Sequence, residues 1–215
     1  MDDFFQRVGT RATAPWPAGR RDLHIHILPT PSEAETLTAP YRGLAESPGL
    51  HTVPAEWIHV TVLHGEPMEQ LTKEEVTGIG DRLTAALAAV EPFDLVLNPA
   101  TPGTVALECA GHPGEPARRL WELAREAVRA ETGDRWPLLP SAYYPHVSIA
   151  YAGAEAEQAD RTALKIWLSD HVADPMTVRA DALQLVAQWH DGAYIRWEQL
   201  RVIPIGPSDQ QPGEC

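Results

Sequence analysis

The chain has 215 residues, of which 44% are hydrophobic, and a formal net charge of −13, so one substantial core is expected. The acidic balance argues against duplex DNA as a partner, because sequence-independent DNA binding relies on basic surface. No apolar run approaches the roughly 18 residues that cross a bilayer, and the first residues do not resemble a signal peptide. We therefore expect no membrane partner and a cytoplasmic location.

The first half of the chain is predicted to alternate between strands and helices. Thr72 and Glu75 form a capping-box pattern at the start of the longest of these helices. The predicted segments are an N-terminal arm over 1–20, a strand over 22–28, a helix within 32–46, a strand over 57–63 and a helix over 72–90.

The second half is predicted to contain further strands and two helices. Asp191-Gly192 is a strong hairpin turn signal between the last two strands. The predicted segments are strands over 93–97 and 104–110, a helix over 114–131, a strand near 145–150, a helix over 155–171, and strands over 176–189 and 193–204. This order indicates an α+β fold with two small, mainly antiparallel sheets and outer helices.

Two predicted strands carry nearly the same motif, 87 positions apart. One contains His59 and Thr61 around Val60, and the other contains His146 and Ser148 around Val147. Because residues i and i+2 share one face of a strand, each copy aims an imidazole and a hydroxyl the same way, with the valine toward the core. A histidine and a hydroxyl on one face are costly to bury without partners, so a polar cleft is the expected environment.

Two opposed imidazoles suit phosphodiester chemistry without a metal. Histidine, with an ordinary pKa of about 6.5, is present in both protonation states near neutrality, so one ring can accept a proton while the other donates one. Hydroxyl groups of Thr61 and Ser148 can donate to the non-bridging phosphate oxygens. The sequence does not assign base and acid between His59 and His146.

The paired motifs resemble those of the two-histidine phosphoesterase superfamily, in particular its bacterial 2'-5' RNA ligase-like branch. Leu23-His24-Ile25-His26-Ile27-Leu28-Pro29 resembles the family's opening strand, and Trp57 precedes the first motif as in many members. The segment 183–206, with Tyr194-Ile195-Arg196-Trp197, resembles the closing hairpin. The resemblance implies one bilobed, pseudo-twofold domain over 21–206 with a central cleft between the motifs, followed by a tail over 207–215. Ser148 stands where threonine is commoner.

Further residues are candidates for substrate binding. His24 and His26 share a face, and the family likeness favours a position in the cleft; Tyr144, beside Tyr143, could stack on a nucleobase. His64 and Tyr151 each follow a motif histidine by five residues, so an unbroken strand would turn them to the opposite face, and we leave them out of the site.

The preferred function is hydrolysis of a 2',3'-cyclic phosphate or of a small cyclic or 2'-5'-linked nucleotide, with a small nucleotide or short RNA as substrate and no cofactor. Alternatives are 2'-5' RNA ligation, non-catalytic nucleotide or RNA binding on the same fold, and a metal-dependent hydrolase that uses His24 and His26 with His59 and His64. No pattern in the sequence indicates the oligomeric state.

Overall fold

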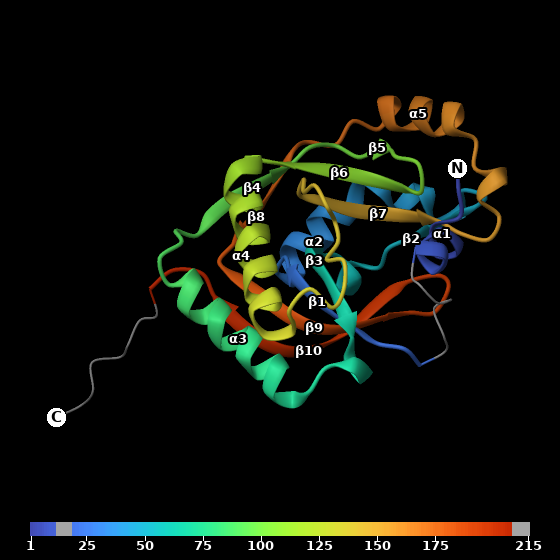
Figure 1. Cartoon of the computed structure of the whole chain (residues 1–215). Coiled ribbons are helices and arrows are strands. Elements are labelled where there is room, and N and C mark those ends of the chain that lie inside the picture. Colours follow the sequence, from blue (N-terminus) through green and yellow to red (C-terminus); the bar gives the residue numbers. More distant parts are fainter. Residues whose placement is uncertain (12–18, 208–215) are drawn as a thin grey trace.

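The computed structural model describes residues 1–11 and 19–207, in which five helices and ten strands are assigned (Figure 1). The helices are α1 (Phe4–Arg11), α2 (Pro31–Thr38), α3 (Lys73–Leu87), α4 (Gly114–Thr132) and α5 (Arg161–Asp170). Short 3-10 segments are η1 (Ala39–Glu46), η2 (Ala55–Trp57), η3 (Met68–Gln70) and η4 (Ala156–Gln158). The strands are β1 (Asp22–Ile27), β2 (Leu50–Thr52), β3 (Val60–Pro67), β4 (Phe93–Leu97), β5 (Thr101–Pro102), β6 (Ala106–His112), β7 (His146–Ala152), β8 (Met176–Ala180), β9 (Ala182–His190) and β10 (Ile195–Pro204).

The strands form one curled, antiparallel sheet in the order β10-β9-β1-β3-β7-β6-β4-β8, with β2 beside β7 and β5 beside β6. The α+β class and the mainly antiparallel pairing are thereby confirmed. The two small sheets that the sequence predicts are halves of this sheet, joined between β3 and β7 by the single pair Val60–Val147. The pseudo-twofold relation between the whole halves stays a prediction.

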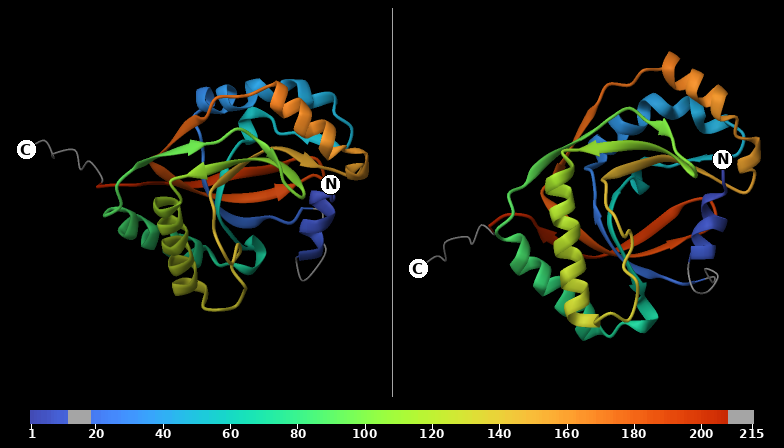
Figure 2. Two further views of the ribbon diagram at one scale, coloured as in Figure 1. Left: turned by 90° about the horizontal axis from the view of Figure 1, so that it is seen from above. Right: turned by 45° about the horizontal axis from the view of Figure 1, so that its top comes forward.

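Helices cover both sides of the sheet (Figure 2), with α2, η1 and α5 on one side and α3 and α4 on the other. Helix α3 packs against α4 and β10, and α4 contacts β3 and β6. Apolar residues recur along α3 at helical spacing, and Ile79, Leu83 and Leu87 are fully buried as a result. None of the helices assigned in residues 1–11 and 19–207 has the length and hydropathy of a membrane span.

Local capping explains where two of the helices begin. Helix α3 begins after Thr72, whose side chain accepts a hydrogen bond from the Glu75 backbone while the Glu75 carboxylate accepts one from the Thr72 backbone. Helix α5 begins only after Asp160, because the Asp160 carboxylate accepts from the backbone of Thr162 and Ala163. The longer helix predicted over 155–171 was therefore wrong at its start.

The strand predicted over 176–189 is in fact two strands. It breaks at Asp181, after which β9 lies between β10 and β1 while β8 pairs with β4 at the opposite end of the sheet. The alternation changes phase at the break, from buried Val178 and Ala180 to buried Leu183 and Leu185, and the prediction of one strand missed this shift. The predicted arm contains α1, of which Phe5 is buried in the core. Residues 12–18 of the arm and 208–215 of the tail lie outside the described residues, and the domain limits stay a prediction.

Candidate active site on β3 and β7

The two motifs lie side by side on neighbouring antiparallel strands. Val60 pairs with Val147, and both side chains are fully buried, as the alternation predicts. Strand β3 begins at Val60, later than the predicted strand over 57–63, so His59 immediately precedes it. Extending the register by one residue in each direction puts His59 opposite Ser148, and Thr61 opposite His146. We call the side of the sheet that carries these four side chains the motif face. Each histidine thus has the hydroxyl of the other motif as its cross-strand neighbour.

Both motif histidines are held by the same backbone contact. His59 Nδ1 is 2.9 Å from the carbonyl oxygen of Trp57, and His146 Nδ1 is 3.2 Å from that of Tyr144. A carbonyl oxygen only accepts hydrogen bonds, so the neutral ring must carry its proton on Nδ1 in each case. The other nitrogen, Nε2, has no hydrogen-bond partner among the described residues and is not fully buried on either ring. Each Nε2 is therefore open to exchange a proton with a ligand.

A β-bulge follows each motif at the same place. Val62 is the extra residue of β3 between Thr61 and Leu63, and Ile149 is the extra residue of β7 between Ser148 and Ala150. Each bulge reverses the alternation, so the residue five positions after the motif histidine returns to the motif face. The expectation that His64 and Tyr151 turn to the opposite face was wrong for this reason, and their absence from the site stays a prediction.

The contacts of His64 and Tyr151 agree with a position of both side chains on the motif face. The His64 ring lies 4.6 Å from that of His24, its register partner on β1. The Tyr151 hydroxyl lies near the Ser148 side chain, and the Tyr151 ring stacks on Phe4 of α1 at 4.6 Å. Helix α1 thereby supports the second motif from behind Tyr151. A single sequence offers no signal for either bulge.

His24 and His26 lie on the motif face but are buried, with exposed fractions of 3% and 0%. The ring of His26 stacks on that of His59, with 4.3 Å between centroids and 21° between planes. Neither ring nitrogen of His26 makes a hydrogen bond of normal geometry, and the Gln188 carboxamide is the polar group beside both His24 and His26. Burial lowers the pKa of both rings well below its ordinary value, so they are neutral. Direct contact of these rings with substrate stays a prediction.

His59 is enclosed more tightly than His146. Its ring is 7% exposed and lies between the ring of His26 and the edge of Trp197, whose centroid is 4.8 Å away. This burial lowers the pKa of His59 to about 4, against the opposing effect of the Trp57 carbonyl, and a charge on His146 lowers it further. His59 is therefore a neutral imidazole, with Nε2 unprotonated, across the physiological pH range.

The second motif has a more open environment. His146 and Ser148 are half-buried, and the ring of Tyr144, 56% exposed, stacks on His146 at 4.7 Å between centroids. The Tyr144 hydroxyl donates to Glu108 Oε2 at 3.3 Å. Tyr143 points the other way and stacks on Trp121 of α4 at 6.0 Å. Of the two tyrosines, Tyr144 is the one beside the motif face.

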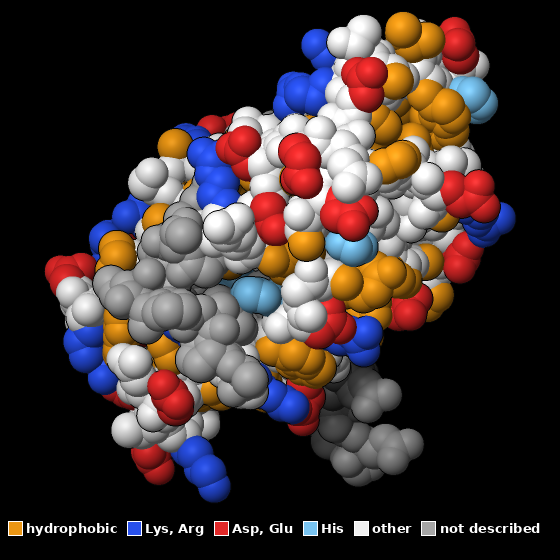
Figure 3. Space-filling model, turned by 90° about the vertical axis from the view of Figure 1, so that its right-hand side faces the viewer, with side chains coloured by type: hydrophobic (Ala, Val, Ile, Leu, Met, Phe, Trp, Pro, Cys, Tyr) orange, Lys and Arg blue, Asp and Glu red, His pale blue; other side chains and the backbone are white. Residues whose placement is uncertain are grey.

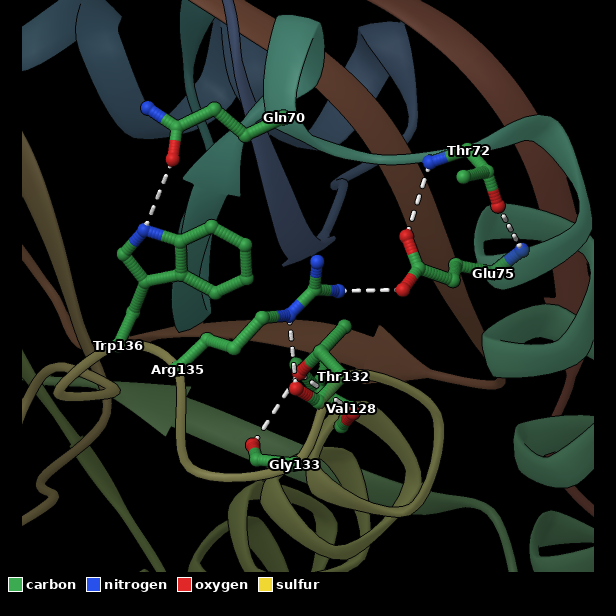
Figure 4. Close-up of polar contacts among 8 residues, drawn as sticks. All are labelled: Gln70, Thr72, Glu75, Val128, Thr132, Gly133, Arg135 and Trp136. Carbon is green, nitrogen blue, oxygen red and sulfur yellow. Dashed lines mark hydrogen bonds and ion pairs between the residues drawn. The ribbon is translucent and has the colours of Figure 1, made fainter.

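The loop that leads into the second motif is tied to the N-terminus of α3 (Figure 4). Arg135 forms an ion pair with Glu75, the capping residue of α3, and donates from Nε to the carbonyl oxygen of Thr132 at 2.8 Å. Trp136 donates from its indole to the side chain of Gln70 in η3 at 3.2 Å. The approach to His146 is thus fixed to the segment that follows β3.

Arg196 of the closing hairpin and the histidines of the metal alternative can also be placed in the structure. Arg196 forms an ion pair with Asp191 at 3.0 Å, and its guanidinium lies 5.8 Å from the centroid of the Trp57 ring. Within residues 1–11 and 19–207, no group of three or more His, Cys, Asp and Glu side chains is arranged to hold a metal ion. The metal alternative built on His24 and His26 thus lacks a ligand set in that part of the chain.

A pocket of about 370 Å³ opens beside the motif strands. Its walls come from α2, η1, β2, η2 and the turn between β9 and β10, and they include Ile149, the residue that follows Ser148. None of the four motif residues lines it, so the central cleft expected between the motifs stays a prediction.

A known protein family matches most of the chain. The model of the 2'-5' RNA ligase superfamily, whose members are phosphoesterases and ligases, matches residues 29–192. The chain therefore belongs to the 2'-5' RNA ligase superfamily, within the two-histidine phosphoesterases. No curated protein sequence matches the chain.

Solved structures share the fold at low identity. LigT of E. coli complexed with 3'-AMP has a TM-score of 0.62 and 15% identity over 87% of this chain and 99% of its own. The protein TT0787 of Thermus thermophilus has a TM-score of 0.63 and 20% identity over 87% and 99%. A further structure described as a phosphoesterase has a TM-score of 0.64 and 14% identity over 86% and 99%. These likenesses support the fold.

Proposed function

We propose that this protein is a metal-independent phosphodiesterase that opens a 2',3'-cyclic phosphate or cleaves a small cyclic or 2'-5'-linked nucleotide. The observation that carries the proposal is the duplicated arrangement of His59 and His146. Each ring donates its Nδ1 proton to the carbonyl two residues before it and keeps Nε2 for the substrate. An acid and a base of this kind supply both proton transfers of a phosphodiester hydrolysis.

His59 acts as the base in the direction of hydrolysis. Its buried ring is neutral, so Nε2 can take a proton from the attacking water while the new P–O bond forms. His146, in its protonated form, gives the Nε2 proton to the ribose oxygen as the old P–O bond breaks. Thr61 and Ser148 donate hydrogen bonds to the non-bridging oxygens, where negative charge is concentrated. In ligation the same groups would exchange roles.

The charge of the chain supports a small substrate. On the described part of the face in Figure 3, Asp and Glu side chains are interspersed with Lys and Arg, without a continuous basic surface. With a net charge of −13, such a surface suits a small nucleotide or the end of a short RNA better than a long polyanion. LigT of E. coli, which shares the fold, has been crystallised with 3'-AMP.

The test is hydrolysis of the four nucleoside 2',3'-cyclic monophosphates in excess EDTA. The wild type is compared with a double variant, His59→Ala with His146→Ala. Turnover by the wild type alone is expected, and the position of the new phosphate identifies the broken bond. Turnover that needs added zinc would favour the metal alternative. Binding of these nucleotides without turnover would favour a binding role or a 2'-5'-linked substrate.

A further inference from the structure

A carboxylate lies on the motif face beside the proposed phosphate site. Glu108 of β6 is the register partner of Ser148, so its side chain leaves the sheet on the same side. It is half-buried and accepts the hydroxyl of Tyr144, whose ring stacks on His146. Glu108 is therefore next to one motif residue across the strands and linked to the other through a single tyrosine.

Among the side chains that the structure describes, those of residues 1–8 and 19–207, no Lys or Arg lies within ion-pair distance of the Glu108 carboxylate. Arg161 reaches the neighbouring turn but donates to the backbone carbonyls of Pro102 and Gly103 instead. The charge of Glu108 adds to the effect of burial in raising the pKa of Tyr144. Within this described part of the chain, the proposed phosphate site thus contains one carboxylate without an ion-pair partner.

We propose that Glu108 is a specificity residue that selects ligands with a single negative charge at phosphorus over ligands with two. The inference rests on the proposed function and names its substrate class, a phosphodiester monoanion without an adjacent terminal phosphate. Hydrolysis of a cyclic phosphodiester turns one negative charge into nearly two at neutral pH, because the second pKa of a phosphomonoester is about 6. The Glu108 carboxylate therefore repels the doubly charged product more strongly than the singly charged substrate, and this repulsion speeds product release.

The size of the effect follows from the separation of the charges. One additional unit charge several ångströms from a carboxylate, partly screened by solvent, changes binding by about tenfold. Glu108→Gln removes the charge but keeps an oxygen that accepts the Tyr144 hydroxyl, so the stack of Tyr144 on His146 should persist. Glu126→Gln, on the exposed surface of α4, makes the same change in net charge away from the site and serves as the matched control.

The experiment compares two ligands that differ by one charge, 2'-deoxyadenosine 3'-phosphate and its O-methyl ester. Calorimetric titration of the full chain gives Kd for each with wild type, Glu108→Gln and Glu126→Gln. The ratio of Kd for the phosphate to Kd for the ester should fall about tenfold in Glu108→Gln and stay constant in Glu126→Gln. An equal ratio in all three proteins, or no binding of either ligand to the wild type, would overturn the role of Glu108.

This design distinguishes a wrong role for Glu108 from a wrong proposed function. Hydrolysis of cyclic nucleotides with an unchanged ratio would keep the phosphodiesterase and remove Glu108 as a specificity residue. A changed ratio without hydrolysis of any cyclic nucleotide would keep Glu108 as a selector of ligand charge and remove the proposed activity. With hydrolysis, Glu108→Gln should also show about tenfold stronger inhibition by the nucleoside phosphate product.

Discussion

The imidazole of His26 stacks on that of His59 with 4.3 Å between ring centroids. This contact joins the proposed base to a ring that has no exposed surface, and Trp197 covers the base from another side. His59 thus owes its neutral state to its neighbours from β1 and β10, as well as to its own motif.

Removing His26 should change the pH profile of the reaction. The pH dependence of kcat/KM reports the ionisations of the free enzyme. Its acidic limb should therefore have its midpoint at the pKa of His59, about 4. His26→Ala opens space beside His59 and admits water, so the limb should move up toward 6.5. His26→Phe keeps a buried ring in the stack and should leave the limb near 4. Identical limbs in all three proteins would contradict this role of His26.

Stability should fall as the solution is acidified below neutrality. The folded-state pKa of His59 and of His190 is lowered to about 4 by burial, and that of His24 and His26 is also lowered. Below about pH 6.5 these histidines take up protons in the unfolded chain but not in the folded chain. The free energy of unfolding therefore falls progressively from about pH 6.5 toward pH 4. His59 alone contributes on the order of 3 kcal/mol over that range. Urea unfolding at several pH values measures this, and a midpoint independent of pH between 6.5 and 4 would disprove it.

The hydroxyls of the two motifs should matter separately from the imidazoles. Thr61→Val and Ser148→Ala each remove one donor to the phosphate, which should lower kcat on the order of 10- to 100-fold. Ser148→Thr keeps the donor and should retain activity within a fewfold. Steady-state kinetics decides the matter: a fully active Ser148→Ala protein would show that Ser148 does not contact the charge that develops at phosphorus.

Tyr144 should act on binding more than on the chemical step. Its exposed ring stacks on His146 and is available to a nucleobase. Tyr144→Ala should raise KM by roughly 10-fold, in line with the loss of one base–aromatic stack, while Tyr144→Phe keeps the ring and should stay near the wild type. An unchanged KM in Tyr144→Ala would remove this residue from the substrate site.

The sequence indicated the fold class and the capping box of α3, because both depend on local periodicity and residue type. It did not indicate that the two motif strands are neighbours in one sheet, since strand pairing depends on contacts between distant parts of the chain. It did not indicate the bulges at Val62 and Ile149, since a bulge is an extra residue defined only against a partner strand. The sequence did not indicate the burial of His26 either, because the Trp197 ring that packs against it comes from a hairpin far along the chain. Glu108 has no motif of its own and became a candidate only through its register with Ser148.

The central claim is that His59 and His146 act together as base and acid, and single-variant kinetics tests it most directly. We would measure kcat for cyclic phosphate hydrolysis in EDTA with wild type, His59→Ala, His146→Ala and the double variant. Each single change should cost at least about 100-fold, and the double variant should be little worse than either, because the two groups serve one concerted step. A single variant that keeps the wild-type rate would contradict the claim.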